Sequence, residues 1–213
     1  MQCVTRNTQP ELMKRKTGKP NPWQDHYTRR AQKEHYPARS VYKLEEIQQK
    51  HRLIKRGSRV LDLGCSPGSW LLYAAELTGE KGQVVGIDLK PVTVRVPSHV
   101  TIMIADVFEM DAGSLGSGFD VVLSDMAPAT TGHRAVDAAR SFSLCEAALE
   151  IARRVLVPGG AFVCKIFQGP DVAHFQDFVR AGFRGQKLFK PRSSRKASKE
   201  TYVIGLGFNL NQS

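Results

Sequence analysis

The sequence predicts an α/β fold, with a mostly parallel sheet, helices on both faces and an antiparallel edge strand near the C-terminus. From residue 59 onward, short apolar runs of strand length alternate with longer segments that have helical spacing. Alternation of this kind is typical of parallel strands joined by helical crossovers. The chain has 213 residues, 41% of them hydrophobic, which is enough for one sizeable buried core.

Apolar runs bounded by Gly, Asp or Ser mark the expected strands. They cover residues 59–64, 82–89, 100–105, 119–124, 161–167, 185–190 and 200–206. Apolar residues at helical spacing predict three helices among them, over residues 69–77, 135–155 and 172–180. A further helical segment, broken near Pro37, is expected over residues 25–49.

The charge of the chain is unevenly distributed. The formal net charge of +11 divides into +10 for residues 1–60, −6 for residues 61–179 and +7 for residues 180–213. Residues 1–24 are expected to form a flexible basic arm, and residues 25–213 a single catalytic domain. Two basic ends around an acidic middle suggest a nucleic-acid partner, and a merely solvated basic surface is the equally weighted alternative.

Several classes of protein are disfavoured. No apolar run is long enough to span a bilayer and no basic amphipathic anchor stands out, so we expect no membrane partner. The N-terminus lacks the apolar core of a secretory signal, so we expect a cytoplasmic protein, with an organellar presequence as the alternative. We also expect a monomer. The cysteines form no C-x-x-C pair and no Cys/His cluster, which argues against a metal site and a disulfide framework: Cys3, Cys65, Cys145 and Cys164.

The loop after the first expected strand, residues 62–70, is the first candidate for a ligand site. In open α/β sheets, ligands bind beyond the carboxyl ends of the strands. Gly64 and Gly68 allow a tight turn and close approach of a ligand, and the helix after Pro67 points free N–H groups at it. The pattern is D-x-G-x-x-P-G, and is neither G-x-G-x-x-G nor a phosphate-binding P-loop. We therefore expect cofactor contacts from Gly64, Pro67, Gly68 and Trp70.

Aspartates lie at the ends of the first three expected strands. Asp62 faces the glycine turn, where it would repel a pyrophosphate but attract an ammonium or sulfonium group. Asp88 suits a ribose diol, and Asp106, followed by Val107, suits an adenine amino group. Each aspartate alone could merely cap a helix or turn, but three in register are less expected by chance. The ligand inferred from this set is S-adenosylmethionine, with Asp125 after the fourth strand as a further contact.

Four polar residues far apart in the sequence are expected to meet at the same edge of the sheet: Lys43, Asp125, Lys165 and Glu200. Their contexts are R-S-V-Y-K-L, L-S-D-M-A-P, F-V-C-K-I-F and S-K-E-T-Y. Taken singly, Lys43 and Glu200 would more often be surface ion-pair residues. Lys165 lies in an apolar strand, where an unpaired ammonium would be costly to bury.

With these motifs, the chain resembles the FtsJ/RrmJ family of S-adenosylmethionine-dependent RNA 2′-O-ribose methyltransferases. The resemblance rests on residues 39–47, 62–70, 124–128, 158–169 and 190–200. It implies a Rossmann-like class I methyltransferase fold, with residues 25–213 as one methyltransferase domain and the four polar residues as a catalytic Lys-Asp-Lys-Glu tetrad. It further implies that the substrate is large-subunit (23S-type) ribosomal RNA, methylated at a uridine.

A ribose 2′-hydroxyl is very weakly acidic, so its methylation needs a base or a strong hydrogen-bond acceptor beside it. The hypothesis is that Lys165 activates the hydroxyl, Asp125 orients Lys165, and Lys43 with Glu200 position the ribose. Whether Lys165 acts as a base or stabilises the developing alkoxide is open. Two other functions remain as alternatives: the same chemistry on transfer RNA, and a non-catalytic RNA-binding assembly factor.

Basic residues cluster beside the two outer members of the tetrad, where we expect them to contact RNA phosphates. They are Arg29, Arg30, Lys33 and Arg39 before Lys43, and Arg192, Arg195, Lys196 and Lys199 before Glu200. The chain also departs from the family pattern at Cys65, Ser66 and Ser69 in the cofactor loop. A further departure, Ala129 where Asn is common, bears on how the target ribose is held.

Overall fold

The computed structural model describes residues 22–209. The helices are α1 (Pro22–Lys33), α2 (Val41–His51), α3 (Ser69–Thr78), a short 3-10 helix η1 (Ala112–Leu115), α4 (Arg134–Val155) and α5 (Asp171–Gly182). The strands are β1 (Arg59–Leu63), β2 (Gln83–Asp88), β3 (Val100–Ile104), β4 (Phe119–Ser124), β5 (Leu156–Phe167), β6 (Phe183–Phe189) and β7 (Glu200–Phe208).

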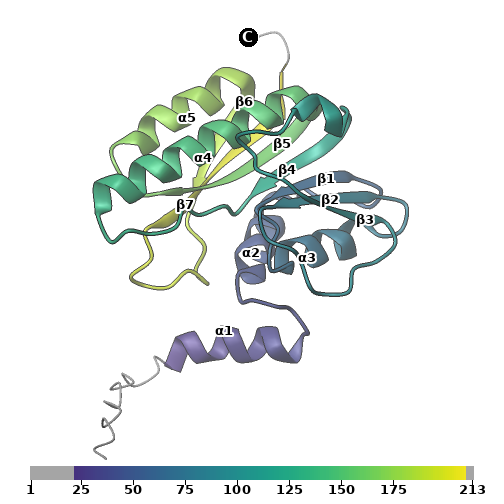
Figure 1. The fold of residues 1–213 in the computed structure, drawn as a ribbon, viewed down its shortest axis with the longest axis horizontal. Coiled ribbons are helices and arrows are strands. Elements are labelled where there is room, and N and C mark those ends of the chain that lie inside the picture. Colours follow the sequence, from purple (N-terminus) through teal and green to yellow (C-terminus); the bar gives the residue numbers. More distant parts are fainter. Residues whose placement is uncertain (1–21, 210–213) are drawn as a thin grey trace, which may run out of the picture.

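The strands form one sheet in the order β3-β2-β1-β4-β5-β7-β6 (Figure 1). β1 to β5 run parallel, and β7 runs antiparallel to both of its neighbours, so the predicted sheet is confirmed. β7 lies one place in from the edge, because β6 pairs along its outer side. The strand order reverses at β1, which lies between β2 and β4. Such a reversal opens a crevice at the carboxyl ends of the strands, where ligands bind in folds of this kind.

Helices cover both faces of the sheet, with α4 and α5 on one face and α2 and α3 on the other (Figure 1). One buried cluster joins α4 and α5 to the sheet and includes Cys145, Phe162 and Phe175. A second joins α2 and α3 to the sheet and includes Leu44 and Trp70. α1 packs on α2 through a small separate cluster. The sheet is therefore buried on both faces, and its polar groups reach solvent at the strand ends.

Most expected elements are present, with small differences at their ends. β5 begins at Leu156 rather than at residue 161, because the chain is already extended after α4 and Leu156 pairs with Phe119. η1 was not expected. α1 begins at Pro22, so the end of the segment expected as a flexible arm is helical; the rest of that arm lies outside the described residues and stays a prediction. Over residues 22–209, no helix is long and apolar enough to cross a membrane.

Candidate active site

The four tetrad residues come from four different elements that meet at the carboxyl end of the sheet. Asp125 follows β4, Lys165 lies in β5, and Glu200 begins β7. Because β4, β5 and β7 are adjacent, the strand register places these three residues close together. Lys43 lies in the first turn of α2 and approaches from the side. The sheet therefore positions three of the groups, and α2 adds the fourth.

The side chains of the tetrad form a continuous chain of opposite charges. The Nζ atom of Lys165 lies 3.1 Å from Oδ1 of Asp125 and 3.9 Å from Oε1 of Glu200. The other carboxylate oxygen of Glu200 lies 2.7 Å from Nζ of Lys43. Lys165 also donates to the backbone carbonyl of Asp125. Its side chain is only 4% exposed, so its polar end is held by protein groups and not by bulk water.

Asp125 is the most tightly held carboxylate of the tetrad. Burial alone would raise the pKa of Asp125, but the charges of Lys165 and Lys43 outweigh burial and lower this pKa below its ordinary value. Asp125 is therefore ionised at neutral pH. An ionised carboxylate accepts hydrogen bonds only, so it fixes the direction from which its donors approach.

Tyr202 belongs to this cluster, although sequence reasoning missed it. It is fully buried, and its hydroxyl donates to Oδ1 of Asp125 at 2.7 Å. Burial and the neighbouring Asp125 raise the pKa of Tyr202 well above its ordinary value, so the hydroxyl stays protonated as a donor. The signal was present in the sequence: Tyr202 follows Glu200 by two residues on a strand, so both side chains point to the same face.

The turn after β1 packs directly against the segment that carries Asp125. Gly64 and Gly68 have φ values of +78° and +112°, a conformation that side chains disfavour. A Cβ atom at Gly64 would lie 2.5 Å from Cγ of Met126. Asp88 accepts hydrogen bonds from the backbone N–H groups of Ser66 and Lys90, and so ties the turn to the end of β2. The glycines therefore allow two strand-end loops to close on each other.

Asp62 is the least satisfied group of this region. It is fully buried, and among the described residues neither of its carboxylate oxygens has a hydrogen-bond partner. Burial, together with the charges of Asp125 and Asp88, raises the pKa of Asp62 well above its ordinary value. A buried carboxyl without donors is costly. A ligand bearing an ammonium or sulfonium group would remove this cost, so these residues fit S-adenosylmethionine.

The other expected cofactor residues lie in different surroundings. Trp70 is buried, its indole N–H donates to the carbonyl of Ser40, and its ring stacks on Tyr202. Trp70 therefore packs α3 against α2 and β7 and supports Tyr202. Its cofactor contact stays a prediction. Asp106 accepts a hydrogen bond from the backbone N–H of Phe108 and so caps a turn, the role named above as the alternative to an adenine contact. Val107, the next residue, packs against the core, and Pro67 is exposed in the turn.

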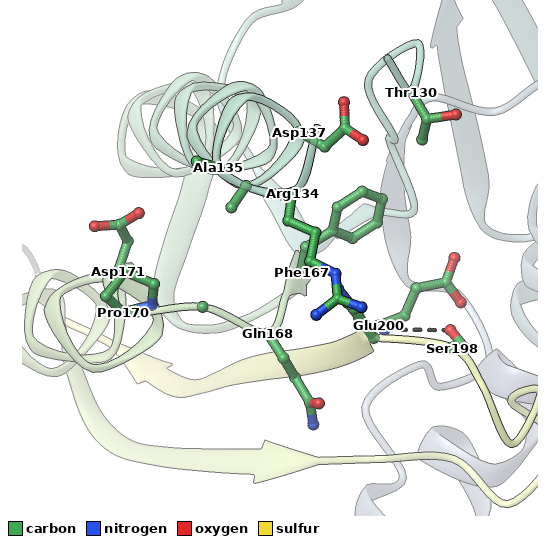
Figure 2. A pocket seen from close by; sticks show the side chains of 13 residues that line it. Thr130, Arg134, Ala135, Asp137, Phe167, Gln168, Pro170, Asp171, Ser198 and Glu200 are labelled. Atoms are coloured by element: carbon green, nitrogen blue, oxygen red, sulfur yellow. Dashed lines mark hydrogen bonds between the residues drawn. The ribbon is translucent and has the colours of Figure 1, made fainter. Parts of the chain in front are cut away.

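Two cavities adjoin the tetrad and share Ser198 and Glu200 in their walls. The first, which we call the α2 cavity, has a volume of about 550 Å³ and is lined by Ala38, Arg39, Ser40, Lys43, Ser193, Arg195, Ala197, Ser198 and Glu200. The second, the α4 cavity, has a volume of about 610 Å³. Its walls come from the start of α4, the end of β5 and the start of β7 (Figure 2). Glu200 therefore stands between two openings.

No metal site accompanies the tetrad in the part of the chain that the structure describes, where no group of three or more His, Cys, Asp or Glu residues could hold a metal ion. Cys65, Cys145 and Cys164 are buried and free. Cys3 lies outside residues 22–209.

A parallel sheet with a glycine turn at its switch point and a buried Lys-Asp-Lys-Glu cluster defines a Rossmann-like class I methyltransferase. The family model described as FtsJ-like methyltransferase matches residues 36–208. The chain therefore belongs to the FtsJ-like methyltransferase family, and it is a methyltransferase enzyme.

Similar proteins agree with this assignment. The chain is 57% identical over 192 residues to a Desulforapulum autotrophicum protein named ribosomal RNA large subunit methyltransferase E, covering 89% of this chain and 95% of the relative. A protein of the same name from Desulfosudis oleivorans is 56% identical, with 91% of this chain and 95% of the relative covered.

Two solved structures share the fold. A Plasmodium falciparum protein described as a ribosomal RNA methyltransferase has a TM-score of 0.72 at 24% identity, covering 81% of this chain and 98% of its own. Aeropyrum pernix fibrillarin with bound S-adenosyl-L-methionine has a TM-score of 0.56 at 16% identity, covering 72% and 68%.

Proposed function

We propose that this enzyme transfers a methyl group from S-adenosylmethionine to a ribose 2′-hydroxyl of large-subunit ribosomal RNA, at a uridine. The observation that carries the proposal is the buried Lys165, held between Asp125 and Glu200, of which Glu200 lines both the α2 and the α4 cavity. The names of the relatives support the substrate, since both are ribosomal RNA large subunit methyltransferases.

The cofactor would lie against the strand-end loops. Asp62 would face its charged amino-acid end, Asp88 retains acceptor capacity for a ribose diol, and the glycine turn leaves room for close approach. S-adenosylmethionine, when bound, supplies a methyl group on a sulfonium. All other tasks fall to the residues of this chain.

Lys165 and its partners are suited to handle the proton and charge of the hydroxyl. Asp125 and Tyr202 form a hydrogen-bonded pair that holds the Lys165 side chain, so that its Nζ atom lies between Asp125 and Glu200. A prepositioned group of this kind needs little reorganisation when charge develops on the ribose oxygen. Glu200, bonded to Lys43, forms the adjoining wall and would orient the ribose.

The α2 cavity offers a surface for RNA phosphates. Arg39, Lys43 and Arg195 line it, and Arg39 donates to the carbonyl of Ser193. Ser193 is buried, and its hydroxyl has no partner among the described residues. Glu46 on α2 accepts hydrogen bonds from the backbone N–H groups at residues 192 and 193, which holds this loop against α2. One residue from each basic cluster, Arg39 and Arg195, therefore lines the same opening, which suits phosphate binding.

The experiment that tests the proposal is transfer of labelled methyl from S-adenosylmethionine to undermethylated large ribosomal subunits, with transfer RNA in parallel. Digestion to nucleosides then identifies the product. We expect the label in 2′-O-methyluridine from the ribosomal RNA. Label only in transfer RNA would assign the same chemistry to another substrate. Tight cofactor binding without transfer to either RNA would identify an assembly factor.

A further inference from the structure

The α4 cavity differs chemically from the α2 cavity on the other side of Glu200. The α2 cavity presents three cationic side chains and the unpartnered hydroxyl of Ser193. The α4 cavity combines the half-buried ring of Phe167 and small apolar residues with the side chains of Arg134 and Gln168. One opening is therefore suited to phosphate, and the other to a flat, partly apolar group that forms hydrogen bonds.

Arg134 and Lys199 are the cationic side chains of the α4 cavity, and Arg134 is the one with a planar fork of donors. It begins α4, and Figure 2 shows its guanidinium directed into the cavity. Among residues 22–209, its side chain has no hydrogen-bond or ion-pair partner. A guanidinium presents only donors, in a planar fork that pairs with two neighbouring acceptors or stacks on a ring. The guanidinium of Arg134 is therefore available to bind a ligand in the cavity.

The acidic residues of the same cavity are engaged or turned away. The carboxylate of Asp137 accepts hydrogen bonds from Thr131 and Gly132, which fixes the loop before α4. These bonds, led by the one from the Thr131 backbone, lower the pKa of Asp137 below its ordinary value. Figure 2 shows the carboxylate of Asp171 pointing away from the opening. With Glu200 paired to Lys43, the cavity offers Arg134 and Gln168 to a ligand.

We propose that the α4 cavity binds the base of a nucleotide next to the target nucleotide, and that Arg134 selects guanine there. This inference rests on the proposed RNA substrate. The walls carry three carboxylates, of Asp137, Asp171 and Glu200, against the two cations Arg134 and Lys199, so the cavity has no net positive charge to attract a phosphate, whereas a neutral base needs none. A volume of about 610 Å³ is ample for one base, and specific RNA recognition favours splayed bases that stack on aromatic or guanidinium planes. Guanine presents two acceptors to an arginine fork, whereas the matching edge of adenine presents one acceptor and one donor.

The position next to the target follows from the shared wall. Ser198 and Glu200 line both cavities, so a strand whose ribose lies at Glu200 has a neighbouring nucleotide within reach of each opening. The RNA phosphates on one side of the target ribose would lie over Arg39 and Arg195, and the base of the neighbouring nucleotide on the other side would lie over Phe167. Arg134 would then act as a specificity residue without touching the reacting atoms.

Site-specific cross-linking tests this placement. A benzophenone is attached to Thr130→Cys, at the exposed rim of the cavity, in a Cys3→Ser background, since Cys65, Cys145 and Cys164 are buried. The labelled protein is irradiated with undermethylated large subunits, and adducts are mapped against the methylated nucleotide, which is located beforehand. We expect adducts at a guanosine immediately beside the methylated nucleotide or one position further. Ala197→Cys, in the α2 cavity, serves as the positive control, and Glu150→Cys, on the far part of α4, as the negative control.

Kinetics of Arg134→Ala supply the second readout. The KM for subunits is expected to rise about 10-fold, with cofactor affinity unchanged, because the variant cannot form the bidentate hydrogen bonds to the base. Arg154→Ala removes an exposed arginine from the same helix and should leave both constants unchanged. Adducts only at distant nucleotides, at a base other than guanine, or absent while Ala197→Cys reacts, would overturn the inference and leave the proposed function intact. Absence of any methylated ribosomal nucleotide would overturn both.

Discussion

Two aspartates at the ends of neighbouring strands have opposite environments. Asp125 accepts from Tyr202 and lies 3.1 Å from the Nζ atom of Lys165, and its pKa is lowered. Asp62, on the paired strand β1, is fully buried but has no partner among the described residues, and its pKa is raised. The catalytic side of the site is thus complete in the protein alone. The side proposed to bind the cofactor contains a buried carboxyl group without a protein partner, which a bound ammonium or sulfonium group would pair. The two sides should therefore respond differently to mutation.

The largest effect is expected for Lys165→Ala. Loss of a positioned proton-transfer or charge-stabilising group typically costs about 10²–10⁴-fold in rate. Single-turnover methyl transfer should fall by that factor, while calorimetric titration should show nearly unchanged cofactor affinity. Lys187→Ala, an exposed lysine on β6, is the matched control.

Because removal of Lys165 leaves Asp125 without its charged partner, the variant should also lose stability. Thermal unfolding of Lys165→Ala and Lys165→Met separates this loss from the loss of activity. A Lys165→Ala protein that folds and still transfers methyl at close to the original rate would show that Lys165 is not the activating group.

Asp62→Asn should act mainly on the cofactor side. Removing a charged partner of the ligand should weaken cofactor binding at least about 10-fold, since hydrogen bonds to charged groups contribute ~1.5–3 kcal/mol. Isothermal titration calorimetry measures this change. Asp120→Asn is a less suitable control, because Asp120 accepts from the backbone of Arg59; the exposed Asp177→Asn is preferable.

The Asp62→Asn prediction also specifies the direction in which the stability difference between the variant and the wild type changes with pH. Since the folded pKa of Asp62 is raised, the contribution of Asp62 to stability is fully present below the unfolded pKa of about 3.9 and is lost as pH rises toward the folded value. The asparagine variant lacks this loss. Its stability relative to wild type should therefore increase with pH in urea titrations, and a constant difference would contradict a buried, unpaired Asp62.

Tyr202→Phe should have an intermediate effect on the catalytic side. The change removes one hydrogen bond to a charged acceptor and leaves the ring stacked on Trp70. We expect a loss of ~1.5–3 kcal/mol in the free energy of unfolding, measured by urea denaturation. Tyr36→Phe removes a comparable bond to the exposed Glu76 and should cost much less. Equal losses in the two variants would mean that the tetrad gains nothing from Tyr202.

The sequence predicted the parts of the site whose signal is local. Strand-end aspartates, the glycine turn and a lysine in an apolar strand are each visible in a few residues, and the sheet brings them together. The packing of Trp70 could not be predicted, because an aromatic residue at the start of α3 can point to the ligand or to the core, and its hydrogen-bond partner Ser40 lies 30 residues away. The α4 cavity was not foreseen for the same reason, since three separate segments form its walls.

The smallest effect is expected on the RNA-binding surface of the α2 cavity. An Arg195→Ala, Lys196→Ala double variant should weaken RNA binding broadly and lower the slope of log affinity against log salt by about 0.7–0.9 for each phosphate that is no longer neutralised. Both residues are exposed, so folding should be unaffected. An Arg180→Ala, Lys187→Ala double variant makes the same charge change away from the tetrad and should leave the slope unchanged. If both double variants lower the slope equally, the protein attracts RNA through its net charge, and the α2 cavity is not a distinct phosphate site.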